Sequence, residues 1–186
     1  MTVVCFGDSN TYGYDPRSFL GERYPAKYRW VDVLRNRAAW PVINEGQNGR
    51  TVPNKWNFLP DEFDLLIVML GTNDLLQGKT SDLIAERMER FLRSLNKESA
   101  KVLLVAPPNL QKGEWVTNDS VVVESVRLSK YYNDLACKYG LYFVDAQQWG
   151  IELAYDGVHF TERGHIAFAE KIYDYINSQI FFNDEV

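Results

Sequence analysis

The sequence has few of the residues on which disulfide-rich and metal-dependent proteins rely. Among its 186 residues are two cysteines, Cys5 and Cys137, and two histidines. The cysteines are far apart and form no Cys-x-x-Cys pair, so reduced structural cysteines are expected rather than a disulfide framework. There is no His-x-x-x-His pair either. The chemistry is therefore expected to need no metal.

The sequence also lacks long apolar runs and clusters of basic residues. No stretch approaches the roughly 20 apolar residues that span a membrane. The net charge is -5, with no block of like charge. Nucleic acids and anionic membranes attract clustered Lys and Arg, so neither is expected as a partner. Residues 1–10 have no basic leader and no cleavage signal, which favours a cytoplasmic protein. The length fits one domain over residues 1–186.

Five short apolar runs are present instead, separated by amphipathic stretches. Several runs are almost continuous Val, Ile and Leu, which is typical of strands buried on both faces. They predict strands at Thr2–Phe6, Pro41–Asn44, Asp64–Leu70, Lys101–Ala106 and Leu141–Val144. Apolar residues at helical spacing predict helices at Lys27–Ala38, Ser81–Asn96, Val121–Tyr139 and Thr161–Ile180. The alternation predicts an α/β sandwich with a mainly parallel sheet.

Polar residues follow four of the predicted strands. They are Gly7–Asn10, Glu45–Gly49, Gly71–Asp74 and, in the last loop, Asp156–His159. Ligands of open α/β sheets bind outside the carboxyl ends of the strands. We therefore expect these four segments to gather at one rim and to form the functional site.

A serine hydrolase needs a nucleophile, a base and a group that orients the base. Ser9 follows a strand-end Gly-Asp, but a serine there is also a common helix N-cap. His159 lies three residues after Asp156, close enough for the carboxylate to reach the imidazole, so it is favoured as the base over His165. A solvated loop histidine is the alternative interpretation of His159.

The remaining rim residues have ordinary structural interpretations as well. Asn73 could serve only to stabilise the turn after the third strand. Gly46 and Gly49 could be loop glycines with positive φ. None of these residues decides the function by itself.

Taken together, the four segments resemble the ordered blocks of the SGNH (GDSL-like) hydrolases. Gly7-Asp8-Ser9 is similar to the block with the nucleophile, and Asp156-Gly157-Val158-His159 to the block with the Asp-x-x-His pair. Asn44–Gly49 and Gly71–Asp74 are similar to the two blocks between them. The resemblance extends over essentially the whole chain.

The resemblance implies a function and a set of residues. The fold would be a three-layer, flavodoxin-like sandwich with a five-stranded sheet. Ser9, His159 and Asp156 would form a catalytic triad that hydrolyses short-chain esters through an acyl-enzyme on Ser9, with acyl transfer to alcohols as a side activity. No cofactor would be required. The oxyanion hole would consist of the N–H groups of Ser9 and Gly49 and the Asn73 side-chain amide, with Gly46 as the less favoured glycine.

The similarity is strongest to the short-chain arylesterase and acyltransferase branch, with two departures. Asn10 stands where the family usually has leucine or isoleucine, which is expected to alter the pocket wall. Loops 53–61 and 107–117 are short for that branch. In the branch such loops help to build the substrate channel and the subunit contacts, so a homo-oligomer is left open.

The aromatic residues near the proposed triad suggest a small acyl site. Tyr12 and Tyr14 closely follow Ser9, and Phe160 follows His159. We expect these rings to narrow the site and to favour small-molecule esters with acetyl-type acyl groups.

Three alternatives have less support. A flavin-binding module would use the hydroxyl-rich segment after the first strand, but Asp8 would then face the phosphate. A metal hydrolase would use Asp156 and His159 with Asp8 or Asp74, with few histidines available. A carbohydrate-binding protein without activity would retain the fold but leave the catalytic residues without a role.

Overall fold

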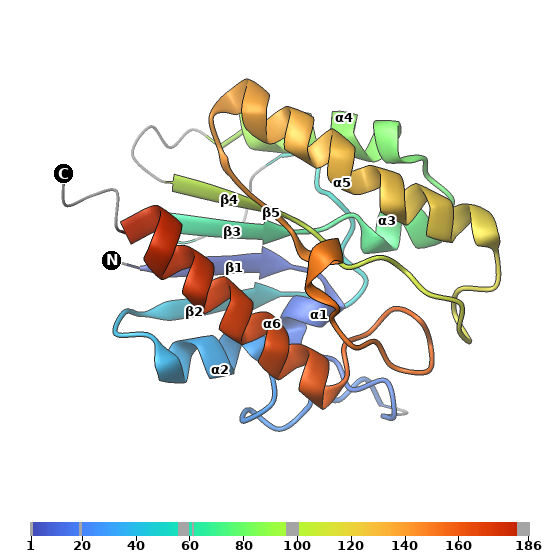
Figure 1. The fold of residues 1–186 in the computed structure, drawn as a ribbon, viewed down its shortest axis with the longest axis horizontal. Coiled ribbons are helices and arrows are strands. Elements are labelled where there is room, and N and C mark those ends of the chain that lie inside the picture. The colour runs from blue at the N-terminus through green and yellow to red at the C-terminus, as the bar shows by residue number, and fades with distance from the viewer. Residues whose placement is uncertain (1, 19, 56–59, 61, 96–100, 182–186) are drawn as a thin grey trace.

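The structure is a computed structural model that describes residues 2–18, 20–55, 60, 62–95 and 101–181. At its centre is a five-stranded sheet in the order β2-β1-β3-β4-β5, with every described pair parallel (Figure 1). This is the flavodoxin-like order. The strands are β1 (Val3–Gly7), β2 (Val42–Gly46), β3 (Leu65–Met69), β4 (Lys101–Ala106) and β5 (Tyr142–Asp145). The predicted α/β fold is confirmed.

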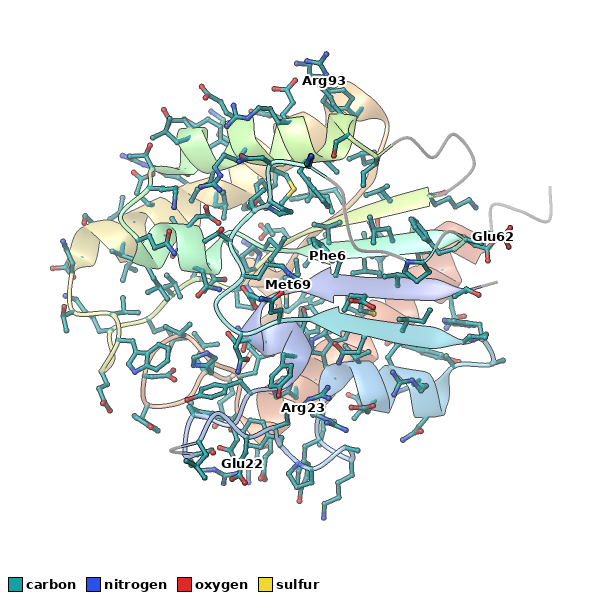
Figure 2. The ribbon with its side chains drawn as sticks, turned by 180° about the vertical axis from the view of Figure 1, so that it is seen from behind. Phe6, Glu22, Arg23, Glu62, Met69 and Arg93 are labelled. Atoms are coloured by element: carbon teal, nitrogen blue, oxygen red, sulfur yellow. The ribbon has the colours of Figure 1, made fainter. Side chains whose placement is uncertain are left out.

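Helices cover both faces of the sheet. On one face α2 (Trp30–Arg37) packs against α6 (Glu162–Tyr175), and on the other α4 (Ser81–Arg93) packs against α5 (Asp119–Tyr139). Successive strand residues point to opposite faces, so every residue of β1 and β3 is buried. Phe6 belongs to the core under α4 and α5, whereas Met69 belongs to the core under α2 and α6 (Figure 2).

The helix boundaries follow local capping. Thr161, where the predicted helix begins, is the N-cap of α6, and its hydroxyl accepts a hydrogen bond from the Gly164 N–H. Helix α5 begins at Asp119, before the predicted Val121, because the Asn118 side chain caps it by accepting from the Ser120 N–H. The end of the predicted helix at Asn96 lies outside the described residues.

Three details of the helix predictions are wrong. The apolar pattern that predicts helices at Ser81–Asn96 and Val121–Tyr139 places Leu83 and Tyr131 on the buried side, but these side chains are 48% and 38% exposed. Their neighbours Ile84 and Tyr132 occupy the buried stripe, and adjacent helical residues diverge by about 100°. The last helix does not continue as an α-helix to Ile180, because Ile176–Phe181 forms a π-helix, η2. This turn still buries Ile180 against the sheet.

Two short helices lie at the carboxyl ends of the strands. Helix α1 (Ser9–Tyr12) follows β1, and α3 (Thr72–Leu76) follows β3. Gly46 ends β2 so close to α1 that a Cβ atom there would lie 2.1 Å from the backbone N of Tyr12. The position of α1 therefore depends on direct backbone contact with the end of β2. None of the helices in the described part of the chain has the length and apolar character to span a membrane.

Candidate functional site

Ser9 is the first residue of α1 and does not cap it. Asp8 is the N-cap, and its carboxylate accepts a hydrogen bond from the Asn10 N–H at 3.0 Å. Burial raises the pKa of Asp8 to about 6, although that hydrogen bond and nearby His159 oppose the rise. The alternative interpretation of Ser9 as a helix cap is therefore wrong, and its hydroxyl is available for another partner.

That partner is the imidazole of His159. The Ser9 Oγ lies 3.0 Å from His159 Nε2, and His159 Nδ1 lies 2.6 Å from Asp156 Oδ2. All three side chains are buried. The structure thus brings together the three residues that the sequence predicted, although about 150 residues separate Ser9 from the other two.

Backbone groups and the imidazole together hold the Asp156 carboxylate. Its Oδ1 accepts hydrogen bonds from the N–H groups of Val158 at 2.9 Å and His159 at 3.0 Å. Burial alone would raise the pKa of Asp156, but the hydrogen bonds from the His159 ring and these two N–H groups outweigh it and lower the pKa below its usual value. An ionised Asp156 fixes Nδ1 of His159 as the protonated nitrogen and leaves Nε2 to accept from Ser9.

His165 does not reach this site. It is fully buried in α6, where its Nδ1 faces the Trp30 N–H at 3.4 Å. The rings of Tyr24 and Phe160 contact it edge-on. Burial, with the charges of His159 and Arg29, lowers the pKa of His165 to about 3. It is a neutral core histidine.

A cavity of about 220 Å³ opens beside Ser9 and His159. Gly49 and Asn73 also line it. The Asn73 Nδ2 donates to the Arg50 carbonyl at 3.0 Å, and this bond orients the amide. The second N–H of the amide takes no part in that bond. Gly46 does not line the cavity, and its N–H donates to the Asn44 side chain at 2.8 Å. Of the two glycines, only Gly49 is therefore placed to face a ligand.

Arg50 connects two of the strand ends at this edge of the sheet. Its guanidinium donates to the carbonyls of Gly7, at 3.0 Å, and Glu45, and lies over the Phe6 ring. The carbonyls belong to the ends of β1 and β2. Arg50 thereby ties together the two strands from which the Ser9 and Gly49 loops leave. The sequence analysis did not identify this role, because a single arginine after Gly49 gives no signal of it.

The aromatic walls of the cavity differ from the prediction. Tyr14 lines the cavity, and its ring centroid lies 4.6 Å from that of His159. Tyr12 instead packs under the Arg23 guanidinium, because the turn of α1 directs it away. Phe160 is buried in the core against Phe168, whereas His159, directly before it, lines the cavity.

Trp115 is an aromatic wall residue that the sequence analysis missed. Its ring meets His159 edge-on at 4.9 Å and is half exposed. The loop 107–117 is pressed onto the Asp156 segment, with the Trp115 N–H donating to the Asp156 carbonyl at 3.1 Å. A Cβ atom at Gly113 would lie 2.4 Å from the Asp156 carbonyl carbon. Because Gly113 permits this close approach, the short loop can place the Trp115 ring directly against His159.

The carboxylates proposed for a metal hydrolase are engaged differently. Asp74 is buried between Arg87, at 3.2 Å, and Lys79, at 3.4 Å, and accepts from the Val52 N–H at 2.8 Å. It therefore forms ion pairs with two cations and anchors the segment after Gly49. Within the described ranges, no three His, Cys, Asp or Glu side chains gather as a metal site would require.

Asn10, expected to alter the pocket wall, does not line the cavity. It is buried, and its side chain binds the backbone on both sides of His159. The Pro53–Asp61 loop falls partly outside the described residues.

The model of the GDSL-like lipase/acylhydrolase family matches residues 5–167. The chain belongs to this family. The resemblance to the SGNH (GDSL-like) hydrolases is thereby confirmed, and with it the class of carboxylic ester hydrolases.

Solved structures of related proteins share the fold over nearly their whole length. The native aryl esterase of M. smegmatis is 26% identical, with a TM-score of 0.82 and coverage of 96% of this chain and 99% of that one. Est24, a carbohydrate acetylesterase from Sinorhizobium meliloti, is 26% identical, with a TM-score of 0.78 and coverage of 95% and 98%. No curated protein sequence matches the chain.

The two histidines give the first prediction. The unfolded His165 binds a proton below about pH 6.5, whereas the folded one does so only near pH 3. Between these values the unfolded state binds more protons, so stability falls as the pH falls, by up to about 1.4 kcal/mol per pH unit. His165→Asn, which keeps an acceptor for the Trp30 N–H, should make the melting temperature less dependent on pH between 6.5 and 4.5.

The same variant should retain most of its esterase kcat at pH 8, whereas His159→Ala should be nearly inactive. Melting curves over pH and initial rates with p-nitrophenyl acetate measure both effects. An inactive His165→Asn protein that is still folded would show that His165, not His159, serves the chemistry.

Proposed function

We propose that the protein is a serine esterase that hydrolyses short-chain, acetyl-type carboxylic esters through an acyl-enzyme on Ser9. The observation that carries the proposal is the continuous chain of short hydrogen bonds from Asp156 through His159 to Ser9, which ends at the cavity. The alignment of a buried carboxylate, an imidazole and a hydroxyl is what acyl transfer from an ester to serine requires.

In the first half-reaction, His159 Nε2 removes the Ser9 proton as Oγ attacks the ester carbonyl. The C–O bond to the alcohol then breaks, and the imidazolium returns its proton to the departing alkoxide. The Asp156 carboxylate stabilises the imidazolium while both are buried. The products of this half-reaction are the free alcohol and an ester on Ser9.

The oxyanion that develops during attack needs hydrogen-bond donors. We assign this role to the backbone N–H groups of Ser9 and Gly49 and to the Asn73 amide, all from residues that line the cavity. The Asn73 side chain is already fixed by its bond to the Arg50 carbonyl. Such a fixed donor requires little reorganisation as charge develops, which is the condition for a large rate effect.

In the second half-reaction, His159 removes a proton from water, which attacks the acyl carbonyl and releases the acid and free Ser9. An alcohol bound in the place of water would give a new ester, and this is the side activity that we propose. Each half-reaction uses the same donors and the same base, so no further group is needed.

The walls of the cavity favour a small acyl group and a flat alcohol group. Tyr14, Leu76, Trp115 and Val158 supply apolar surface around about 220 Å³. Half of the Trp115 side chain is exposed at this site, where an aryl or sugar ring could stack on it. The aryl esterase and carbohydrate acetylesterase among the related structures support this substrate class.

The nucleophile can be identified directly. A fluorophosphonate should add once per chain, on Ser9, as read by peptide mass spectrometry. Ser9→Ala should stay folded and lose activity by about four to six orders of magnitude. Ser129→Ala, which also removes a buried serine hydroxyl, serves as the control and should keep its rate. Labelling of another serine would contradict the proposal.

The oxyanion role of Asn73 predicts a selective loss of rate. Asn73→Ala should lower kcat by roughly 10²–10³ with little change in KM, because the amide serves charge that exists mainly in the transition state. Asn177→Ala is the matched control, since the Asn177 amide also donates to a backbone carbonyl, at 3.0 Å, but on η2. If Asn73→Ala lowers the melting temperature without a loss of kcat, the side chain only stabilises its turn.

The size of the cavity predicts the acyl preference. Each methylene that fits an apolar pocket gains about 0.8 kcal/mol. A kcat/KM that falls from acetate to octanoate would therefore show that steric exclusion of the longer acyl chains outweighs this gain. We expect such a fall, measured with p-nitrophenyl esters, and a shift toward longer acyl groups in Trp115→Ala. Tyr139→Ala, which removes an exposed ring on α5, should leave the preference unchanged. A wild-type maximum at octanoate would contradict the assignment.

A further inference from the structure

The side chain of Asn10 connects the Ser9 segment to the His159 segment. Its Nδ2 donates to the Val158 carbonyl at 3.1 Å, and its Oδ1 accepts from the Phe160 N–H at 2.9 Å. Asn10 is 4% exposed, so both bonds are shielded from water. One amide therefore binds the residues immediately before and after His159.

These two bonds complete the hydrogen bonding of the backbone around His159. The backbone groups of His159 itself bind elsewhere. Its N–H donates to Asp156 Oδ1 at 3.0 Å, and its carbonyl accepts from the Ala154 N–H at 2.7 Å. Asn10 thus binds the two flanking backbone groups that these contacts leave over.

The backbone of Asn10 is itself fixed. Its N–H donates to the Asp8 carboxylate, and α1 packs against the Gly46 backbone without room for a Cβ atom. Ser9 precedes Asn10 directly. Asn10 is joined to Ser9 by a peptide bond and to the backbone around His159 by two buried hydrogen bonds. The position of His159 relative to Ser9 is therefore set by Asn10 as well as by the Ser9–His159 hydrogen bond.

We propose that Asn10 is a positioning residue, which holds His159 Nε2 at the distance and angle at which it can accept the Ser9 proton. The amide offers a donor and an acceptor in a fixed plane, and it does so at any pH. Leucine or isoleucine, usual at this position in the family that the sequence resembles, can supply neither.

The inference rests on the proposed function and can be separated from it by experiment. Asn10→Leu should lower kcat by about 100-fold with little change in KM, since a displacement of about 1 Å at the reacting groups has an effect of this size. The rate of fluorophosphonate labelling of Ser9 should fall in parallel. Gln147→Leu is the matched control, because it removes a side-chain amide that donates to the Ser125 carbonyl at 2.7 Å, away from the cavity.

Asn10→Asp provides a test that loss of stability alone would not mimic. The protonated carboxyl can donate to the Val158 carbonyl and accept from the Phe160 N–H, as the amide does. The ionised carboxylate offers two acceptors and repels the Val158 carbonyl. The ratio of the variant's kcat to that of the wild type should therefore fall as the pH rises from about 5.5 to about 8.5. Asp8, Asp156 and His159 are present in both proteins, so the ratio divides out their wild-type titration and leaves the pH dependence that the new carboxyl introduces.

The outcomes distinguish the two proposals. Melting curves at each pH show whether the variants are folded under assay. If folded Asn10→Leu keeps the wild-type kcat, or if the Asn10→Asp ratio does not change with pH, Asn10 is not a positioning residue. If Ser9→Ala is fully active, the proposed function fails, whatever the Asn10 variants do. A kcat loss in Asn10→Leu equal to that of Gln147→Leu would also overturn the inference.

Discussion

The parallel direction of the strands is the constraint on which the site depends. Because every described strand pair is parallel, the chain leaves β1, β2 and β3 at the same edge of the sheet. Ser9, Gly49 and Asn73 follow those three strands and are brought to one cavity. The His159 segment, after β5, arrives by a longer route and needs bonds of its own to reach them. The contacts of Asn10 and Asp156 provide these bonds.

Three buried aspartates lie at this edge, and their surroundings give them different properties. Asp74 faces two cations and acts as a structural anchor. Asp156 has a lowered pKa because two backbone N–H groups and the His159 ring donate to it. Asp8 has one backbone donor, and burial raises its pKa to about 6. All three follow glycine-containing or apolar segments in the sequence. Which of these carboxylates can orient a histidine depends on the groups that surround it in the folded chain.

Much of the fold and of the proposed site could be predicted from local patterns. Apolar runs such as Leu65–Met69 identify strands buried on both faces, and the four polar segments identify the edge where the site lies. Wall residues could not be predicted in this way. Tyr12 and Phe160 are close to the triad in sequence but point elsewhere, whereas Trp115 is remote in sequence and contacts His159. Side-chain direction depends on the turn of α1 and on loop packing, which no local pattern encodes.

The residues proposed for the chemistry and those proposed to select the substrate are held in different ways. Ser9, His159 and Asn73 are held by backbone contacts and buried hydrogen bonds, so a change there disturbs several partners at once. Tyr14 and Trp115 contribute rings to the cavity, and Trp115 is half exposed. Its backbone N–H, which any residue except proline supplies, donates to the Asp156 carbonyl, and its ring packs edge-on against His159. A substitution at position 115 would therefore change the shape of the cavity and the packing on one side of His159, while the backbone contact to Asp156 stays in place. For the proposed esterase, this makes the cavity wall the part in which we expect substrate preference to be adjusted.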